Sequence, residues 1–215
     1  MLVTAVSPDG GIRARIGRAG DVEMTFVGRA YRTYNEANLA HQLARLGALA
    51  WVAYDRALTD EHRGALGQTA EEFAEQERRP KDDRRQRYDA DLAAVEADGA
   101  SPDGWLRIRA RGMLRWDVQI LSGALRLPMV EFLAELHAAV RALFADREVK
   151  ATIVKARYYD LGIPSAWRDL LIDPDRVVRS AGWEGHPVGV HSSTPPGGLR
   201  PRPGSGGAAR RVTGP

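Results

Sequence analysis

The sequence predicts an α+β protein in which an antiparallel β-meander is followed by a long helix, with this arrangement duplicated later in the chain. Three observations lead to this prediction. Apolar and polar residues alternate in short segments near the N-terminus, a stretch with helical periodicity follows them, and the tetrapeptide Ser7-Pro8-Asp9-Gly10 recurs as Ser101-Pro102-Asp103-Gly104.

The meander is expected to begin with a strand at residues 2–6, followed by a tight turn at residues 8–11. Residues 12–16 read Ile-Arg-Ala-Arg-Ile, the alternation of a half-buried strand. A second turn leads to a third alternating segment at residues 22–26. One face of this sheet is therefore apolar, and the other carries Arg13, Arg15, Glu23 and Thr25.

A long helix is expected from an N-cap at Asn35 to about Leu58. One apolar stripe is suited to cover the sheet and consists of Leu39, Leu43, Leu46, Ala50 and Ala53. A second stripe, which a single three-stranded sheet cannot also bury, contains Ala44, Ala48, Trp51, Tyr54 and Leu58. We interpret Ala48, Trp51, Tyr54 and Leu58 as a candidate assembly surface between copies or subunits; an ordinary core is the alternative.

The repeat is expected to be diverged. Asp117-Val118 aligns with Asp21-Val22 if two residues are inserted, and in the helix Leu133, Val140 and Leu143 fall where Leu39, Leu46 and Leu49 fall, after Pro128. Residues 95–99 make a poor strand, so the second sheet is expected to be only a hairpin. The β-branched run at residues 151–154 either extends the second helix to Tyr158 or forms a strand.

The chain is expected to divide into a first unit at residues 1–60, a charged connector at 61–100, a second unit at 101–181 and a tail at 182–215. In the connector, Thr69 and Glu72 have capping-box spacing for a helix that stops near Pro80, and residues 88–95 form another short helix. The tail is rich in Pro, Gly, Ser and Arg, which predicts disorder.

Composition excludes several classes of protein. The chain has no cysteine, so disulfides, iron–sulfur clusters and thiol nucleophiles are absent. The sequence has no signal-peptide pattern and no run long enough to span a membrane, which predicts a cytoplasmic protein. It also has no nucleophile elbow, phosphate-binding glycine loop or dinucleotide fingerprint, so we predict no catalytic residues and no cofactor.

No metal site is predicted, because the five histidines are dispersed. His41 and His137 lie on predicted helices without carboxylates in helical register, and His62 adjoins the connector. His186 and His191 lie in the tail and supply only two ligands.

Arginines on the two predicted second strands are candidate contacts for nucleic acid, because alternate residues on a strand point to the same side. These residues are Arg13, Arg15, Arg107, Arg109 and Arg111. The alternative is a solvated sheet face that discourages edge pairing. The net charge is only +3, and Asp21, Glu23 and Asp117 are close by in the sequence. In the tail, Arg200, Arg202, Arg210 and Arg211 have no acidic neighbours.

In the first of these units, three strands are joined by a Ser-Pro-Asp-Gly turn and a Gly-x-x-Gly-Asp-Val turn, and then come Tyr31-Arg32 and a helix that opens with Glu36. The order of these elements resembles the YbaB/EbfC-like family. In particular it is similar to the actinobacterial branch that includes accessory proteins of type VII (ESX) secretion. The resemblance covers residues 1–60 and, more weakly, 101–150. It implies a meander followed by a long helix, usually assembled as a dimer.

Two functions accompany this resemblance. The first, which we favour, is a noncatalytic adaptor or chaperone-like protein that acts beside secretion substrates through protein–protein assembly, with a protein partner or as a homodimer. The alternative is a nucleoid-associated DNA-binding protein that uses the strand arginines.

Overall fold

The computed structural model describes residues 1–18 and 20–162 and confirms the α+β class, with two three-stranded antiparallel meanders each followed by a long helix. The predicted disordered tail at 182–215 lies outside the described residues, as do the tail arginines, His186 and His191.

The structure of the first unit agrees closely with the prediction from its sequence. It contains the strands β1 (Leu2–Val6), β2 (Ile12–Gly17) and β3 (Val22–Phe26), a short 3-10 helix η1 (Ala30–Thr33) and the helix α1 (Glu36–Ala65). The predicted N-cap is confirmed, since Asn35 Oδ1 accepts a hydrogen bond from the Asn38 amide at 2.8 Å. The helix α1 continues past Leu58, where we expected it to end.

The second unit has the same order of elements: β4 (Glu96–Ala100), β5 (Leu106–Arg111), β6 (Arg115–Ile120), η2 (Ala124–Arg126) and α4 (Met129–Tyr158). The expectation of a mere hairpin is wrong, because β4 pairs with β5 along its whole length. The strand β4 also lies inside residues 61–100, the range that we predicted to be a connector. Residues 151–154 belong to α4, so the alternative of a strand there is wrong.

Two short helices join the units: α2 (Ala70–Arg78) and α3 (Asp83–Ala94). The capping box is confirmed, because the Thr69 hydroxyl accepts from the Glu72 amide and the Glu72 carboxylate accepts from the Thr69 amide. The helix α3 starts earlier than expected, with the Asp82 side chain as its N-cap.

The strand register corrects our alignment of the repeat. Ala14 pairs with Met24, and Ile108 pairs with Val118, so Val118 is the counterpart of Met24 and no residues are inserted. In the helices, the buried residues Leu39, Leu43, Leu46 and Ala50 correspond to Phe132, Leu136, Ala139 and Leu143. The helix alignment that we predicted was therefore one residue out of step.

The recurring tetrapeptide forms the same turn twice. Ser7 and Ser101 are buried, and their hydroxyl oxygens accept hydrogen bonds from the amides of Ile12 (2.9 Å) and Leu106 (3.0 Å). A buried amide left without an acceptor costs about 1–3 kcal/mol, so a serine serves both turns.

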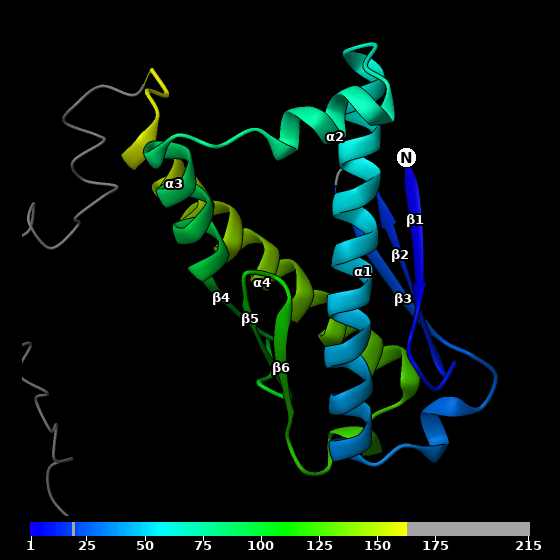
Figure 1. The fold of residues 1–215 in the computed structure, drawn as a ribbon. Helices are drawn as coiled ribbons and strands as arrows, with labels where there is room; N and C mark the ends of the chain where they lie inside the picture. Colours follow the sequence, from blue (N-terminus) through cyan, green and yellow to red (C-terminus); the bar gives the residue numbers. More distant parts are fainter. Residues whose placement is uncertain (19, 163–215) are drawn as a thin grey trace, which may run out of the picture.

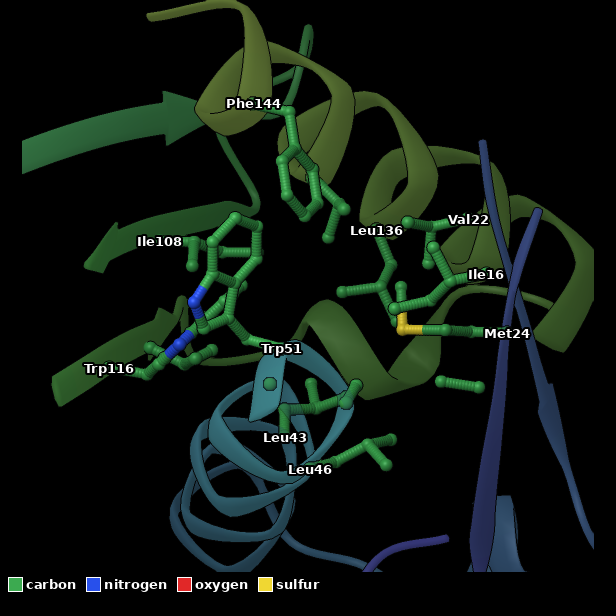
Figure 2. Close-up of a pocket in the computed structure, with 15 residues that line it drawn as sticks. Ile16, Val22, Met24, Leu43, Leu46, Trp51, Ile108, Trp116, Leu136 and Phe144 are labelled. Carbon is green, nitrogen blue, oxygen red and sulfur yellow. The ribbon is translucent and has the colours of Figure 1, made fainter. Parts of the chain in front are cut away.

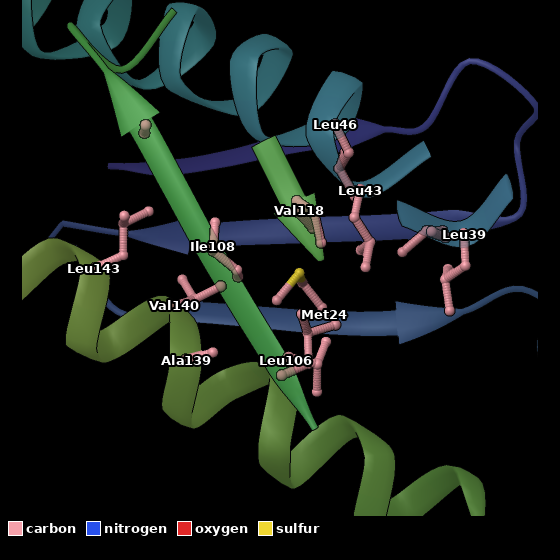
Figure 3. Packing of buried hydrophobic residues seen from close by; sticks show 14 of the residues in the cluster. Met24, Leu39, Leu43, Leu46, Leu106, Ile108, Val118, Ala139, Val140 and Leu143 are labelled. Atoms are coloured by element: carbon pink, nitrogen blue, oxygen red, sulfur yellow. The ribbon is translucent and has the colours of Figure 1, made fainter. Parts of the chain in front are cut away.

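The two units share one core. Each helix packs against the first strand of its own sheet and the last strand of the other, α1 against β1 and β6, and α4 against β4 and β3 (Figure 1). The inner faces of the sheets meet, with Met24, Ile108 and Val118 between them (Figure 3). The second stripe of α1 is thus partly covered within one chain, with Leu58 left exposed, and the units are related by an approximate two-fold axis.

Candidate functional site

Trp51 lies where the two helices meet. Its counterpart in the second unit, one residue after Leu143, is Phe144, and the two ring centroids are 6.2 Å apart. Tyr54 also packs against Trp51, with ring centroids 5.9 Å apart. Equivalent residues that touch each other must lie close to the approximate two-fold axis, so Trp51 and Phe144 mark it.

A small apolar cavity lies beside Trp51 and Phe144. It has a volume of about 40 Å³ and is lined by apolar side chains of both sheets and both helices. Figure 2 shows Trp51, Trp116 and Ile108 at one end and Ile16, Val22 and Met24 at the other. The cavity offers room for little more than a water molecule and presents no polar side chain, so it is unsuited to an organic ligand or to acid–base chemistry.

A second and larger hollow, of about 600 Å³, is also lined by this aromatic pair. Its apolar lining is formed by Ile16, Trp51, Tyr54, Leu58 and Phe144. Three charged residues, Asp55, Arg147 and Glu148, surround these side chains. The lining combines three aromatic side chains with three charged ones, and a concave site of this size is typical of a binding pocket. We refer to it below as the helix hollow.

Arg147 is the most unusual charged group in the helix hollow. Its guanidinium carbon lies 4.4 Å from the centre of a Trp51 ring, in a cation–π contact. The side chain is partly buried, and this desolvation lowers the pKa of the guanidinium, while Glu148 and Asp55 act in the opposite direction. Among the described residues Arg147 has no ion-pair partner within 4.0 Å. Its contact with Trp51 leaves the guanidinium without a carboxylate at ion-pair distance among the described residues.

The structure brings together three of the four residues of the predicted assembly surface. Trp51 and Tyr54 are partly buried in the helix hollow, and Leu58 is 38% exposed at its rim. Ala48 is partly buried but does not line the hollow. The sequence interpretation missed Phe144 and Arg147. Aligning the repeats from their helix starts, Glu36 with Met129, would have identified Phe144 as the counterpart of Trp51.

The candidate nucleic-acid contacts are separated by the fold. Arg13 and Arg15 lie on the outer face of the first sheet, and Arg107, Arg109 and Arg111 lie on the outer face of the second. Because the inner faces of the sheets meet in one core, the outer faces point away from each other. The five arginines consequently do not form one basic surface.

Carboxylates lie beside most of these arginines. Arg107 and Arg109 both donate to Asp98, at 2.8 and 3.1 Å, and the hydrogen bond from Arg107 contributes most to lowering the Asp98 pKa. Arg111 lies 3.8 Å from Glu96, and Arg15 lies 3.8 Å from Glu23. Arg13 makes no ion pair within the described part of the chain. The second sheet therefore presents largely neutralised charge, which is unfavourable for binding phosphates.

The histidines of the described residues do not converge. Within residues 1–18 and 20–162 no three His, Asp or Glu side chains are placed to hold a metal ion. His137 Nε2 instead accepts a hydrogen bond from the Met24 amide at 2.8 Å. In the same part of the chain, no helix is sufficiently long and apolar to cross a membrane.

These features define a class: an α+β protein with two meander–helix units around one core and a hollow near its approximate two-fold axis. Comparisons of the chain with models of known families, with curated proteins and with solved structures gave no match.

Proposed function

We propose that this chain is a noncatalytic protein-binding module, an adaptor or chaperone-like protein of the kind associated with type VII secretion. The helix hollow is the observation on which the proposal rests. It combines three aromatic rings with the guanidinium of Arg147, which forms no ion pair with any described residue. The association with secretion rests on the resemblance of residues 1–60 to that family.

The chemistry of the helix hollow suits a segment of a partner protein. Trp51, Tyr54 and Phe144 offer apolar area at little cost in side-chain entropy, and aromatic and arginine residues are enriched among those that dominate binding energy. Arg147 suits a carboxylate or a backbone carbonyl. We therefore expect the partner to insert an apolar side chain next to an acidic or carbonyl group.

The alternative, DNA binding through the strand arginines, receives less support from their placement. A duplex meets one face of a protein, whereas these arginines lie on two opposed faces and most have carboxylate neighbours. DNA binding would produce an affinity for any duplex that falls steeply with salt.

The test is site-specific photo-crosslinking of the full chain in extracts of its source cells. A photoreactive residue replaces Leu58 at the rim of the helix hollow or, as the matched control, Val52, which is 45% exposed on α1 and does not line the hollow. We expect discrete protein adducts from position 58 and few from position 52. A secretion component or substrate among the adducts would support the more specific assignment.

Binding is then measured by calorimetry between the purified chain and the partner found. Leu58→Glu should weaken binding at least roughly tenfold, equivalent to about 1.4 kcal/mol, because it places a carboxylate at the apolar rim. Val52→Glu should bind like the unsubstituted chain, and both variants should have unchanged melting temperatures. Equal adducts from the two positions, or equal binding by the two variants, would refute the proposal.

A further inference from the structure

Among the described residues, the outward backbone groups of β1 have no hydrogen-bond partner, whereas those of the equivalent strand β4 do. The Ser7 amide donates a hydrogen bond to the Ile12 carbonyl at 2.9 Å. This bond shows which residues of β1 form hydrogen bonds with β2 and which face away from it. In an antiparallel pair, hydrogen-bonded and non-hydrogen-bonded residue pairs alternate, so the backbone groups of Val3 and Ala5 bond to β2. The amides and carbonyls of Leu2, Thr4 and Val6 therefore face outward.

The equivalent edge of the second unit is covered. Ser101 donates to the Leu106 carbonyl, so the outward-facing residues of β4 are Glu96, Asp98 and Ala100. The Asp98 amide donates to Asp146 Oδ2 at 2.8 Å, and the Glu96 carbonyl accepts from Lys150 Nζ at 2.8 Å. Side chains of α4 thus occupy the groups that a new strand would need.

At the equivalent positions, the helix α1 has no side chains that can do the same for β1. The α1 residues equivalent to Asp146 and Lys150 are Ala53 and Ala57, whose methyl groups cannot form hydrogen bonds. No described residue bonds to the outward groups of Leu2, Thr4 or Val6. In Figure 1, β1 lies at the margin of the molecule, with no labelled element outside it.

The side chains of β1 also lack the usual protection of an edge. The strand has no charged residue or proline, the features that commonly prevent edge-to-edge pairing. Leu2 is 59% exposed and Val6 is 42% exposed. Leu49 is 50% exposed and lies one helical turn before Ala53, so it is on the side of α1 that faces this edge.

We propose that β1 of one chain pairs antiparallel with β1 of a second copy, forming a continuous six-stranded sheet across a two-fold axis at Thr4. The strand is self-complementary about that residue: Thr4 meets Thr4 of the second copy, and Leu2 meets Val6. Thr–Thr and apolar cross-strand pairs are favourable, and no like charges face each other within the pair. The contact is isologous and closes as a dimer.

The proposed dimer is independent of the helix hollow, which lies on the side of α1 where it meets α4. A pair of five-residue strands is a small interface, so the dimer should form weakly and reversibly. In sedimentation equilibrium of the full chain, the mean mass should rise toward twice the monomer mass between roughly 10 μM and 1 mM.

Thr4→Lys tests the interface because it places two like charges at the axis. It should raise the dissociation constant at least roughly tenfold, since facing like charges destabilise a strand pair. Thr25→Lys is the matched control, because Thr25 is also exposed, on the outer face of the same sheet but on β3. Thr4→Pro is a second variant: the Thr4 amide faces away from β2, so proline removes only the bond to the other chain.

A disulfide supplies a direct test, because the chain contains no cysteine. In the proposed pair the Thr4 residues exchange hydrogen bonds, with Cα atoms about 5.5 Å apart, a distance compatible with a disulfide. Under mild oxidation Thr4→Cys should form a covalent dimer much faster than Thr25→Cys. The proposal is overturned if the chain remains monomeric at about 1 mM, if Thr4→Lys dimerises unchanged, or if Leu58→Glu rather than Thr4→Lys abolishes the dimer.

Discussion

Gly47 shows how single side chains fit two diverged units together. A Cβ built at Gly47 would lie 2.5 Å from the ring of Trp116, so only glycine leaves room for that indole. At the equivalent positions of the other half, the helix carries Val140 and the strand carries Val22, and both line the same cavity. The small Gly47 and the large Trp116 thus fill the space that two valines of medium size, Val140 and Val22, fill in the other half.

Gly47→Ala should therefore destabilise the protein even though alanine favours a helix. We expect a loss of about 1–3 kcal/mol in the free energy of unfolding, the usual cost of overpacking, measured by urea denaturation. Gly64→Ala is the control in the same helix, because a Cβ there meets nothing within 4 Å. It should stabilise by up to about 1 kcal/mol. Equal effects of the two substitutions would contradict the packing argument.

The two long helices differ in what they offer to the sheets. The helix α4 contributes His137 to the Met24 amide on β3, and Asp146 and Lys150 to β4. The equivalent positions of α1 are Ala44, Ala53 and Ala57. Hydrogen bonds from helix side chains to the strand backbone are consequently concentrated in α4, which also supplies the acceptor for Met24 on β3.

The bond from Met24 to His137 should make stability depend on pH. Burial, and next to it the positive charge of Arg141, lower the pKa of His137, while Glu23 acts in the opposite direction. A neutral ring accepts the bond and a protonated ring cannot. With the folded pKa below the unfolded value of 6.5, the contribution is present above pH 6.5 and is lost as the pH falls through the folded pKa.

Urea denaturation at pH 7.5, 6.5 and 5.5 measures this effect. Solvent screens the partly exposed ring, so we expect a loss below about 1 kcal/mol on acidification. His137→Gln retains an acceptor that does not titrate and should lose less stability over the same range. A variant with the same pH dependence as the unsubstituted protein would show that another group is responsible.

At the scale of the whole molecule, the two units form one core. Ile12, Ala14 and Met24 of the first sheet belong to the same buried cluster as Ile108 and Val118 of the second. Each helix is shared, because it packs on strands of both sheets. Neither unit can open without exposing the inner face of the other, so the described part of the chain should unfold cooperatively.

Native-state hydrogen exchange tests this cooperativity. Amides of the central strands β2 and β5 should open with the same free energy, because both require global unfolding. Amides of α2, a helix without a buried residue, should exchange by local opening and serve as the internal reference. A difference above about 1 kcal/mol between β2 and β5 would mean that the units unfold separately.

Local chemistry made much of this fold predictable. Alternation identified the strands β2 and β3, the turn after residue 6 placed β1, and the repeat placed β5 and β6. Side-chain caps placed the starts of α1 and α2. These features depend on neighbours within a few residues, which a sequence displays directly. The leucine stripe of α1 likewise specified its buried face.

The strand β4 escaped prediction because its residues are explained only by distant contacts. A Cβ at Gly99 would lie 2.2 Å from the Ala139 carbonyl of α4, so glycine lets the helix approach the strand. Asp98 disfavours a strand locally, but its side chain accepts from Arg107 and Arg109 and its amide donates to Asp146. Asp98 and Gly99 both disfavour a strand locally, yet both are required by the contacts of the packed structure.

The candidate site was likewise predictable only in part. The sequence determined that Trp51, Tyr54 and Leu58 form a second apolar stripe on α1, since helical periodicity fixes which residues share a face. Only the tertiary structure decided that Phe144 and Arg147 complete the helix hollow and that the strand arginines are divided between opposed faces. It also decided that no described residue bonds to the outer edge of β1. Those outcomes depend on how two units pack around a common axis, which periodicity within one segment does not encode.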